Sequence, residues 1–148
     1  MSLLGIASII SIGLMIGAEF AVWVFINPIL WKLEEGARTQ AVQLFAKRLG
    51  TAMPFWYTVN FVFLAAGAIL LRGQHGVWLL SASAGIWAAV IVLTLLFLVP
   101  INNRLARPDA ALPLNEAHRQ HLRWDTLHRA RVVALGAAFV LLLAAFPL

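Results

Sequence analysis

With 148 residues the chain is long enough for one domain, and its composition, 62% hydrophobic and 11% charged, is far from that of a soluble protein. The net charge of +5 comes from basic residues beside long apolar segments, which indicates membrane topology and not a nucleic-acid partner. Cysteine is absent, so the sequence excludes disulfides, thiolate metal sites and cysteine nucleophiles.

Four apolar segments are predicted to cross a bilayer, whose hydrocarbon core of about 30 Å requires roughly 20 apolar residues of helix. These spans cover about residues 3–26, 54–71, 77–99 and 132–148. Polar helical extensions, about residues 37–50 and 114–131, precede the second and fourth spans, with a kink expected at Pro54. We therefore expect an all-α integral membrane four-helix bundle, a single domain whose second and fourth helices extend into the cytoplasm.

The basic residues predict how the bundle is oriented. Ten of the 11 Lys and Arg residues lie in or next to the first and third loops, and only Arg72 lies in the second. Because basic loops stay in the cytoplasm, the sequence predicts a multi-pass protein of the cytoplasmic (inner) membrane with both termini outside. Membrane lipids would surround it. Gly13, Gly17 and Ala21 form a ridge of small residues that is a candidate face for a homo-oligomer.

Glu19 is an ionisable residue at membrane depth in the first span. Insertion scales assign about 2.5–3.5 kcal/mol to a charged residue at mid-span, so Glu19 is expected to face the bundle interior and to have a partner. An ion pair with Arg131 or Arg104 would make its role structural. Binding a metal ion, accepting a proton or holding a substrate hydroxyl would make it functional, and the sequence leaves both readings open.

A row of polar residues marks one face of the fourth helix. His121, Asp125 and His128 are spaced four and three residues apart, a spacing at which imidazole and carboxylate groups are able to share one metal ion. The candidate metal ligands are therefore Glu19, His121, Asp125 and His128. The alternative is that histidines in an arginine-rich helix end are solvated or hydrogen-bonded. His128 lies nearest the bilayer and is expected to approach Glu19.

Three asparagines complete the set of polar residues near the membrane. Asn60 lies within the second span and should face the same interior as Glu19, because a buried amide needs partners. Asn102 and Asn103 end the third span in the sequence VPINNR, where one of them is expected to cap the helix. We expect these groups to form one polar layer toward the cytoplasmic side.

The stretches VPINNRLA and RWDTLHRAR, together with the Asn-Pro that ends the first span, resemble the anthrone oxygenase family of small four-span membrane proteins. The resemblance covers the whole chain in topology and length. Carried over by position, it marks Asn102, Asn103, Trp124, His128 and Arg131. It implies oxygenation of an activated aromatic carbon, anthrone to anthraquinone, with a lipophilic small molecule and dioxygen as reactants.

Two mechanisms are compatible with these residues. Without a cofactor, Glu19 or His128 would remove a methylene proton, while Arg131 and an Asn amide would stabilise the oxyanion. With one metal ion, the four candidate ligands would leave open positions for dioxygen. The predicted catalytic residues are Glu19, His128 and Arg131, and the predicted substrate-binding residues are Asn60, Asn102, Asn103 and Trp124. The alternative is a non-enzymatic protein: a haem or quinone carrier with His128 as axial ligand, a transporter subunit or an assembly partner.

Overall fold

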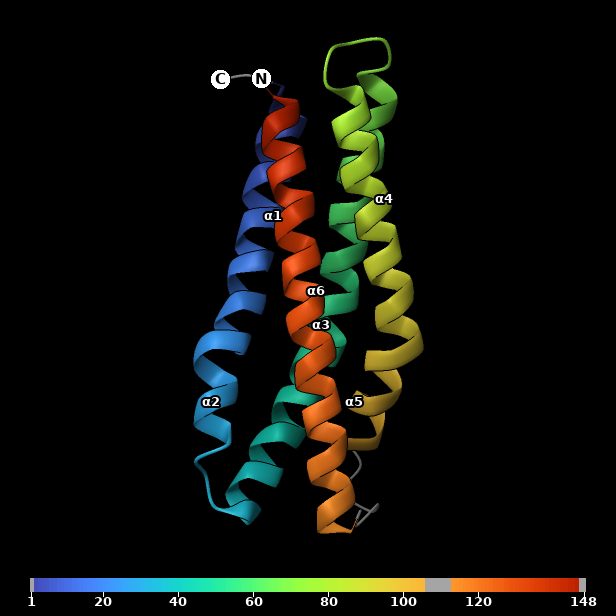
Figure 1. The fold of residues 1–148 in the computed structure, drawn as a ribbon. Helices are drawn as coiled ribbons and strands as arrows, with labels where there is room; N and C mark the ends of the chain where they lie inside the picture. Colours follow the sequence, from blue (N-terminus) through green and yellow to red (C-terminus); the bar gives the residue numbers. More distant parts are fainter. Residues whose placement is uncertain (1, 106–112, 147–148) are drawn as a thin grey trace.

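The structure, a computed structural model, describes residues 2–105 and 113–146, in which every regular element is a helix. Four rods are formed by α1 (Leu3–Ala21), the π-helical turn η1 (Val22–Ile26) and α2 (Asn27–Leu30); by α3 (Glu35–Leu70); by α4 (Val77–Leu93), the π-helical turn η2 (Thr94–Leu98) and α5 (Val99–Leu105); and by α6 (Leu114–Ala145). Each rod is long and apolar enough to cross a membrane. The predicted all-α four-helix membrane bundle is confirmed (Figure 1).

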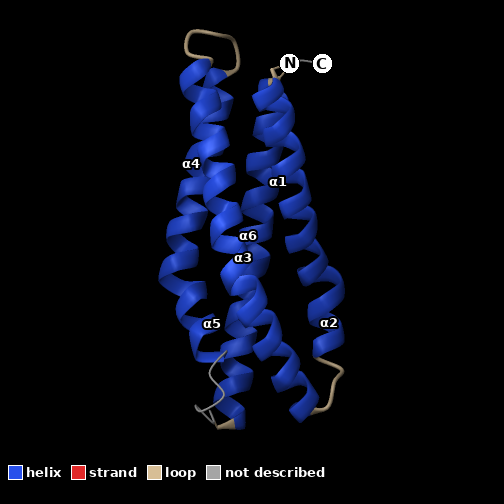
Figure 2. Ribbon diagram, turned by 180° about the vertical axis from the view of Figure 1, so that it is seen from behind, coloured by secondary structure: helices blue, strands red, loops and turns tan. Residues whose placement is uncertain are grey.

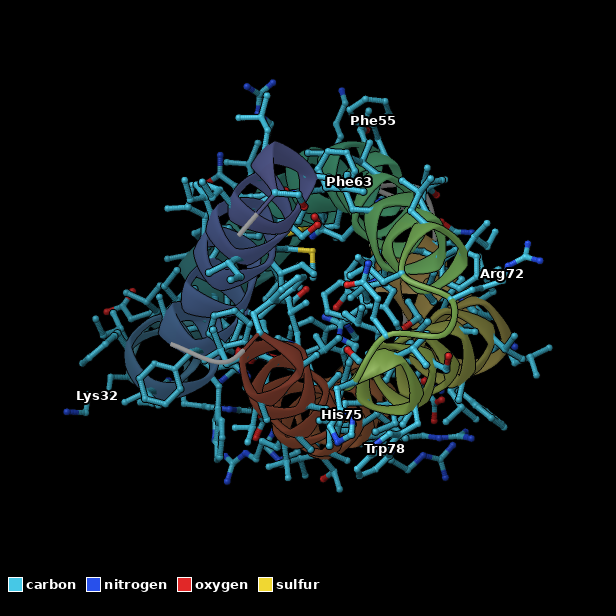
Figure 3. All side chains as sticks on the ribbon, turned by 90° about the horizontal axis from the view of Figure 1, so that it is seen from above. Lys32, Phe55, Phe63, Arg72, His75 and Trp78 are labelled. Atoms are coloured by element: carbon cyan, nitrogen blue, oxygen red, sulfur yellow. The ribbon has the colours of Figure 1, made fainter. Side chains whose placement is uncertain are left out.

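The rods run side by side with alternating direction. α1 begins and α6 ends at one end of the bundle, near the link between α3 and α4, whereas the link between α2 and α3 lies at the opposite end (Figures 1 and 2). α5 ends and α6 begins at that opposite end too, which we call the charged end. Seen along the bundle, the rods follow the order α1, α3, α4, α6, and each packs against two neighbours (Figure 3).

Apolar side chains cover the outside of the bundle as well as its interior. Phe55 and Trp78 are 73% and 67% exposed, and both point away from the bundle (Figure 3). The interior is filled by fully buried side chains such as Ile12, Met15 and Trp87. A helix that is apolar on every face is typical of a lipid-embedded segment, because its backbone polar groups are satisfied within the helix itself.

The helix boundaries differ from the predicted ones where prolines and asparagines suggested an end. The first rod continues through Pro28, which lies in the first turn of α2, directly after the π-helical turn η1. α3 continues through Pro54 and joins the predicted extension and span into one helix. Asn102 and Asn103 lie inside α5, so neither has the expected place at a helix end.

Candidate functional site

A cavity of about 410 Å³ lies between all four rods, in the part of the bundle nearer the charged end. Its walls include Glu19 and Val22 from the first rod, residues between Ala46 and Thr58 from α3, Thr94, Leu95, Val99, Asn102 and Asn103 from the third rod, and Trp124, His128 and Arg131 from α6. A volume in this range accommodates a drug-sized organic molecule.

The cavity has an exposed side and a buried side. Thr58 of α3 is exposed, and Leu95 of the third rod is 56% exposed, so the opening lies between these two rods. Glu19 and His128 are only 2% and 1% exposed, and they form the buried floor contributed by the first and fourth rods. A molecule that enters between α3 and the third rod therefore meets Glu19 and His128 last.

Glu19 has a hydrogen-bond donor on each carboxylate oxygen. The Tyr57 hydroxyl donates to Oε1 at 3.0 Å, and Arg131 Nη2 donates to Oε2 at 2.7 Å. The ion pair expected with one of two arginines is thus formed with Arg131. Since an isolated charge is strongly disfavoured in hydrocarbon, Arg131 and Tyr57 together explain how a carboxylate is held at this depth.

His128 contacts both residues of the Glu19–Arg131 ion pair. Its Nε2 lies 3.1 Å from the backbone oxygen of Glu19, which only accepts hydrogen bonds, so Nε2 is the donor. Nδ1 lies 2.9 Å from Arg131 Nη2 and 3.2 Å from Glu19 Oε2. Trp124 stacks on the ring, with centroids 4.7 Å apart. Both ring nitrogens are therefore engaged, and His128 positions Arg131 and the backbone of Glu19.

The two π-helical turns contribute directly to the cavity walls, with Val22 from η1 and Thr94 and Leu95 from η2. A π-helical turn accommodates one extra residue, which changes the direction of the side chains beside it, and such turns occur often at functional sites. Sequence reasoning missed both turns. It also missed Tyr57, which is the only tyrosine in the sequence. Tyr57 lies three residues before Asn60, on the same face of the helix.

His121 and Asp125 belong to a separate group nearer the charged end, the Asn27 cluster, formed by Asn27, His121 and Asp125. The amide of Asn27 donates to Asp125 and accepts from His121 Nε2, which lies 3.2 Å from Asn27 Oδ1. Arg129 pairs with Asp125 at 2.6 Å, and the Trp31 ring stacks on His121. These contacts fasten the end of the first rod to α6.

The four predicted metal ligands are not brought together. Glu19 and His128 lie at the cavity floor, whereas His121 and Asp125 lie in the Asn27 cluster. Across residues 2–105 and 113–146, no group of three or more His, Asp or Glu side chains is placed to hold a metal ion. The spacing on α6 was read correctly as one face, but Asn27 and two arginines satisfy the groups that metal binding would have used.

Of the four predicted substrate-binding residues, three line the cavity and one does not. Asn102, Asn103 and Trp124 line the cavity. Asn60 does not, because it is completely buried between α1 and α3, where Ser11 donates to its Oδ1 at 2.6 Å. Trp56 Nε1 in turn donates to Ser11 at 3.0 Å. Asn60 therefore faces the bundle interior, as predicted, but it links two helices there and does not line the cavity.

Comparison with known proteins identifies a family. The model of the anthrone oxygenase family matches residues 41–141. This range includes Tyr57, Trp124, His128 and Arg131, whereas Glu19 lies before it. No curated protein and no solved structure gave a significant match. Because the family model covers more than half of the sequence, the chain belongs to the anthrone oxygenase family.

Proposed function

We propose that the chain is a membrane-embedded oxygenase that converts an anthrone-like, lipophilic aromatic compound into the corresponding quinone with dioxygen. The observation that carries the proposal is the Glu19–Arg131 ion pair at the floor of a cavity of about 410 Å³. Family membership supports the reaction class. The opening between α3 and the third rod, flanked by the exposed apolar residue Leu95, suits a substrate that is dissolved in the bilayer.

The proposed reaction starts with loss of a proton from the methylene group, which lies opposite the carbonyl in the central ring of the substrate and is conjugated with it through the aromatic rings. Glu19 takes this proton, because each of its carboxylate oxygens accepts one hydrogen bond and keeps a further lone pair, whereas each ring nitrogen of His128 has a single bonding site that is already engaged. The negative charge then moves to the substrate oxygen, where Arg131 stabilises it. The net charge of the floor is unchanged during this step, so no isolated charge forms in the low-dielectric interior.

Dioxygen completes the reaction. The electron-rich carbon of the enolate forms a bond with dioxygen, which gives a peroxide at that carbon after protonation. Loss of the remaining hydrogen on this carbon and cleavage of the O–O bond release water and leave a carbonyl group. The CH₂ group and one O₂ thus become C=O and H₂O, and dioxygen is the oxidant. In this scheme Glu19 and Arg131 are catalytic residues, whereas His128 is a positioning residue.

The other cavity residues would hold the ring system. Trp124 offers an indole face and an Nε1–H that is buried and has no hydrogen-bond partner in the described part of the chain. The amides of Asn102 and Asn103 lie on the third rod and supply both donors and acceptors. An apolar cavity with a few polar groups at fixed points is typical of sites for small organic molecules.

The direct test is quinone formation and dioxygen uptake by the purified protein with anthrone as substrate. Glu19→Gln should lower turnover by roughly 100-fold or more, the usual contribution of a general base. Glu34→Gln, at an exposed glutamate outside the cavity, and Arg129→Lys on the outer face of α6 should leave turnover unchanged. Arg131→Lys should lower turnover because the ammonium group of lysine does not reproduce the planar guanidinium, whose Nη2 contacts both Glu19 and His128.

Folding of each variant is checked by size-exclusion chromatography and by thermal unfolding in detergent. The double variant Glu19→Gln with Arg131→Gln removes both charges, so it provides an inactive reference without an unpaired buried charge. The proposal is overturned if the wild-type protein does not accelerate quinone formation, or if folded Glu19→Gln retains full turnover.

A further inference from the structure

A second, smaller cavity lies beside the main cavity, nearer the charged end. We call it the side cavity. It has a volume of about 50 Å³. All four rods contribute to its walls: Val22, Ile26, Asn27 and Leu30 from the first rod, Val42, Phe45, Ala46 and Leu49 from α3, Asn102 and Leu105 from α5, and His121 and Trp124 from α6. The proposed reaction does not yet use this space.

The side cavity shares part of its wall with the main cavity. Five residues line both spaces: Val22, Ala46, Leu49, Asn102 and Trp124. Two of them belong to the first rod and to α6, the rods that form the buried floor. Val22 lies three residues after Glu19, and Trp124 stacks on His128 with ring centroids 4.7 Å apart. The common wall therefore extends to the floor, where the reacting carbon of the substrate would lie.

The walls of the side cavity suit a small apolar molecule better than water. Nine of the twelve lining residues are apolar. Among the polar ones, Asn27 has both ends of its amide engaged, since it donates to Asp125 and lies 3.2 Å from His121 Nε2 through Oδ1. A buried water molecule needs roughly two to four polar partners, and a cavity of about 10–15 Å³ is already large enough to hold one. The side cavity thus has room for a diatomic molecule but few hydrogen-bonding groups for water.

Dioxygen is the reactant that must reach the floor after the substrate has bound. In the proposed reaction it meets the carbon of the enolate, which forms only once Glu19 has removed a proton. At that stage the substrate lies between the floor and the opening of the main cavity. Dioxygen carries no charge and no hydrogen-bond donor, so apolar surroundings favour it over water. Its size and its polarity both match the side cavity.

We propose that the side cavity is a binding site for dioxygen, from which dioxygen crosses the common wall to the reacting carbon. This inference rests on the proposed function, because it concerns the second reactant of the same site. Ala46 has the smallest side chain of the common wall, and Leu49 beside it is only half-buried. Rotamer changes of Leu49 next to this small residue open the wall for a diatomic molecule.

Filling the side cavity tests the proposal. Val42 on α3 and Ile26 on the first rod line the side cavity but not the main cavity. Val42→Phe and Ile26→Phe should each lower kcat/KM for dioxygen several-fold at saturating anthrone, because the larger side chain takes the space. Neither should change the rate of anaerobic deuterium exchange at the methylene carbon, since that step needs no dioxygen. Val62→Phe, at a 55% exposed valine that lines neither cavity, is the matched control and should behave as the wild-type protein does.

Xenon provides a measurement that does not depend on turnover, because it binds in apolar cavities. In crystals under xenon pressure, anomalous density should mark the side cavity of the wild-type protein and of Val62→Phe. The same density should be absent from Val42→Phe. Folding of each variant is checked by thermal unfolding in detergent, and the two filled variants alter different rods, so the test does not depend on one substitution.

Wild-type values of kcat/KM for dioxygen in the folded phenylalanine variants of Val42 and Ile26 would overturn the inference. Absence of xenon from the side cavity of the wild-type protein would overturn it too, as would an equal loss of deuterium exchange, which would place the effect in the main cavity. The proposed function fails separately. If the wild-type protein neither exchanges the methylene protons nor oxidises anthrone, the proposed function is wrong, and the xenon density alone decides whether the side cavity holds a small apolar molecule.

Discussion

Glu19 and Arg131 are the two residues on which the proposed chemistry depends. A carboxylate deep in an apolar helix is expected to have a partner, and this requirement gave an ion pair with Arg131 or Arg104 as one of the two readings that the sequence left open. Tyr57 was not predicted, because a tyrosine in an apolar span has an ordinary packing explanation. The metal-ligand prediction considered only the spacing on α6, whereas the amide of Asn27, on another rod, engages both His121 and Asp125.

The ion pair makes a quantitative prediction about stability. Glu19→Gln and Arg131→Gln should each lower the free energy of unfolding by about 3–5 kcal/mol, because each leaves one charge buried without its partner. The double variant should lose less than either single variant, since no lone charge remains. Denaturant unfolding in micelles measures all three variants. Simple additivity of the two losses would show that the residues do not act as a pair.

At the scale of elements, the helices differ from the predicted ones at the two π-helical turns, because these turns do not follow the regular period of an α-helix. Both η1 and η2 insert a residue into an apolar stretch, and neither VWVFI nor TLLFL contains a glycine or proline that would signal it. Neither turn was therefore predictable from the sequence. The spans themselves were predictable, because long apolar runs have few alternatives in a bilayer.

The link between α3 and α4 makes a prediction of its own. Gly76 has φ of +91°, and a Cβ atom there would lie 2.7 Å from the backbone oxygen of Ala145. Gly73 has φ of +80° with no atom within 4 Å of a Cβ. Gly73→Ala should therefore cost about 1–2 kcal/mol, the penalty of the left-handed conformation, and Gly76→Ala should cost clearly more. Equal losses in thermal unfolding would mean that α4 and α6 are not in close contact there.

At the scale of the whole molecule, composition and the distribution of basic residues predict most of the architecture. The cavity was not predictable in the same way, because it depends on how four rods rotate against one another. This is the reason why Asn60 was assigned to the site and was found instead between α1 and α3. A residue on a helix that borders the cavity lines the cavity only if tertiary packing orients its side chain toward it.

Orientation in the membrane is testable because the chain contains no cysteine. Ten of 11 basic residues flank the first and third loops, so we expect the charged end to be cytoplasmic. Cysteine placed at Ser2 or Gln74 should react with a membrane-impermeant maleimide on intact cells. Cysteine placed at Glu34 or Arg119, both exposed positions, should react only after permeabilisation. The reverse labelling pattern would invert the proposed topology.

The central claim is that Glu19 removes a proton from a substrate bound in the cavity, and this step is separable from the reaction with dioxygen. Under strictly anaerobic conditions, the purified protein is incubated with anthrone in deuterated buffer, and deuterium at the methylene carbon is measured by mass spectrometry. We predict that the wild-type protein accelerates this exchange and that Glu19→Gln does not, while Glu34→Gln behaves as the wild-type protein does. Exchange at the rate of the protein-free control, or equally fast exchange with Glu19→Gln, would contradict the account.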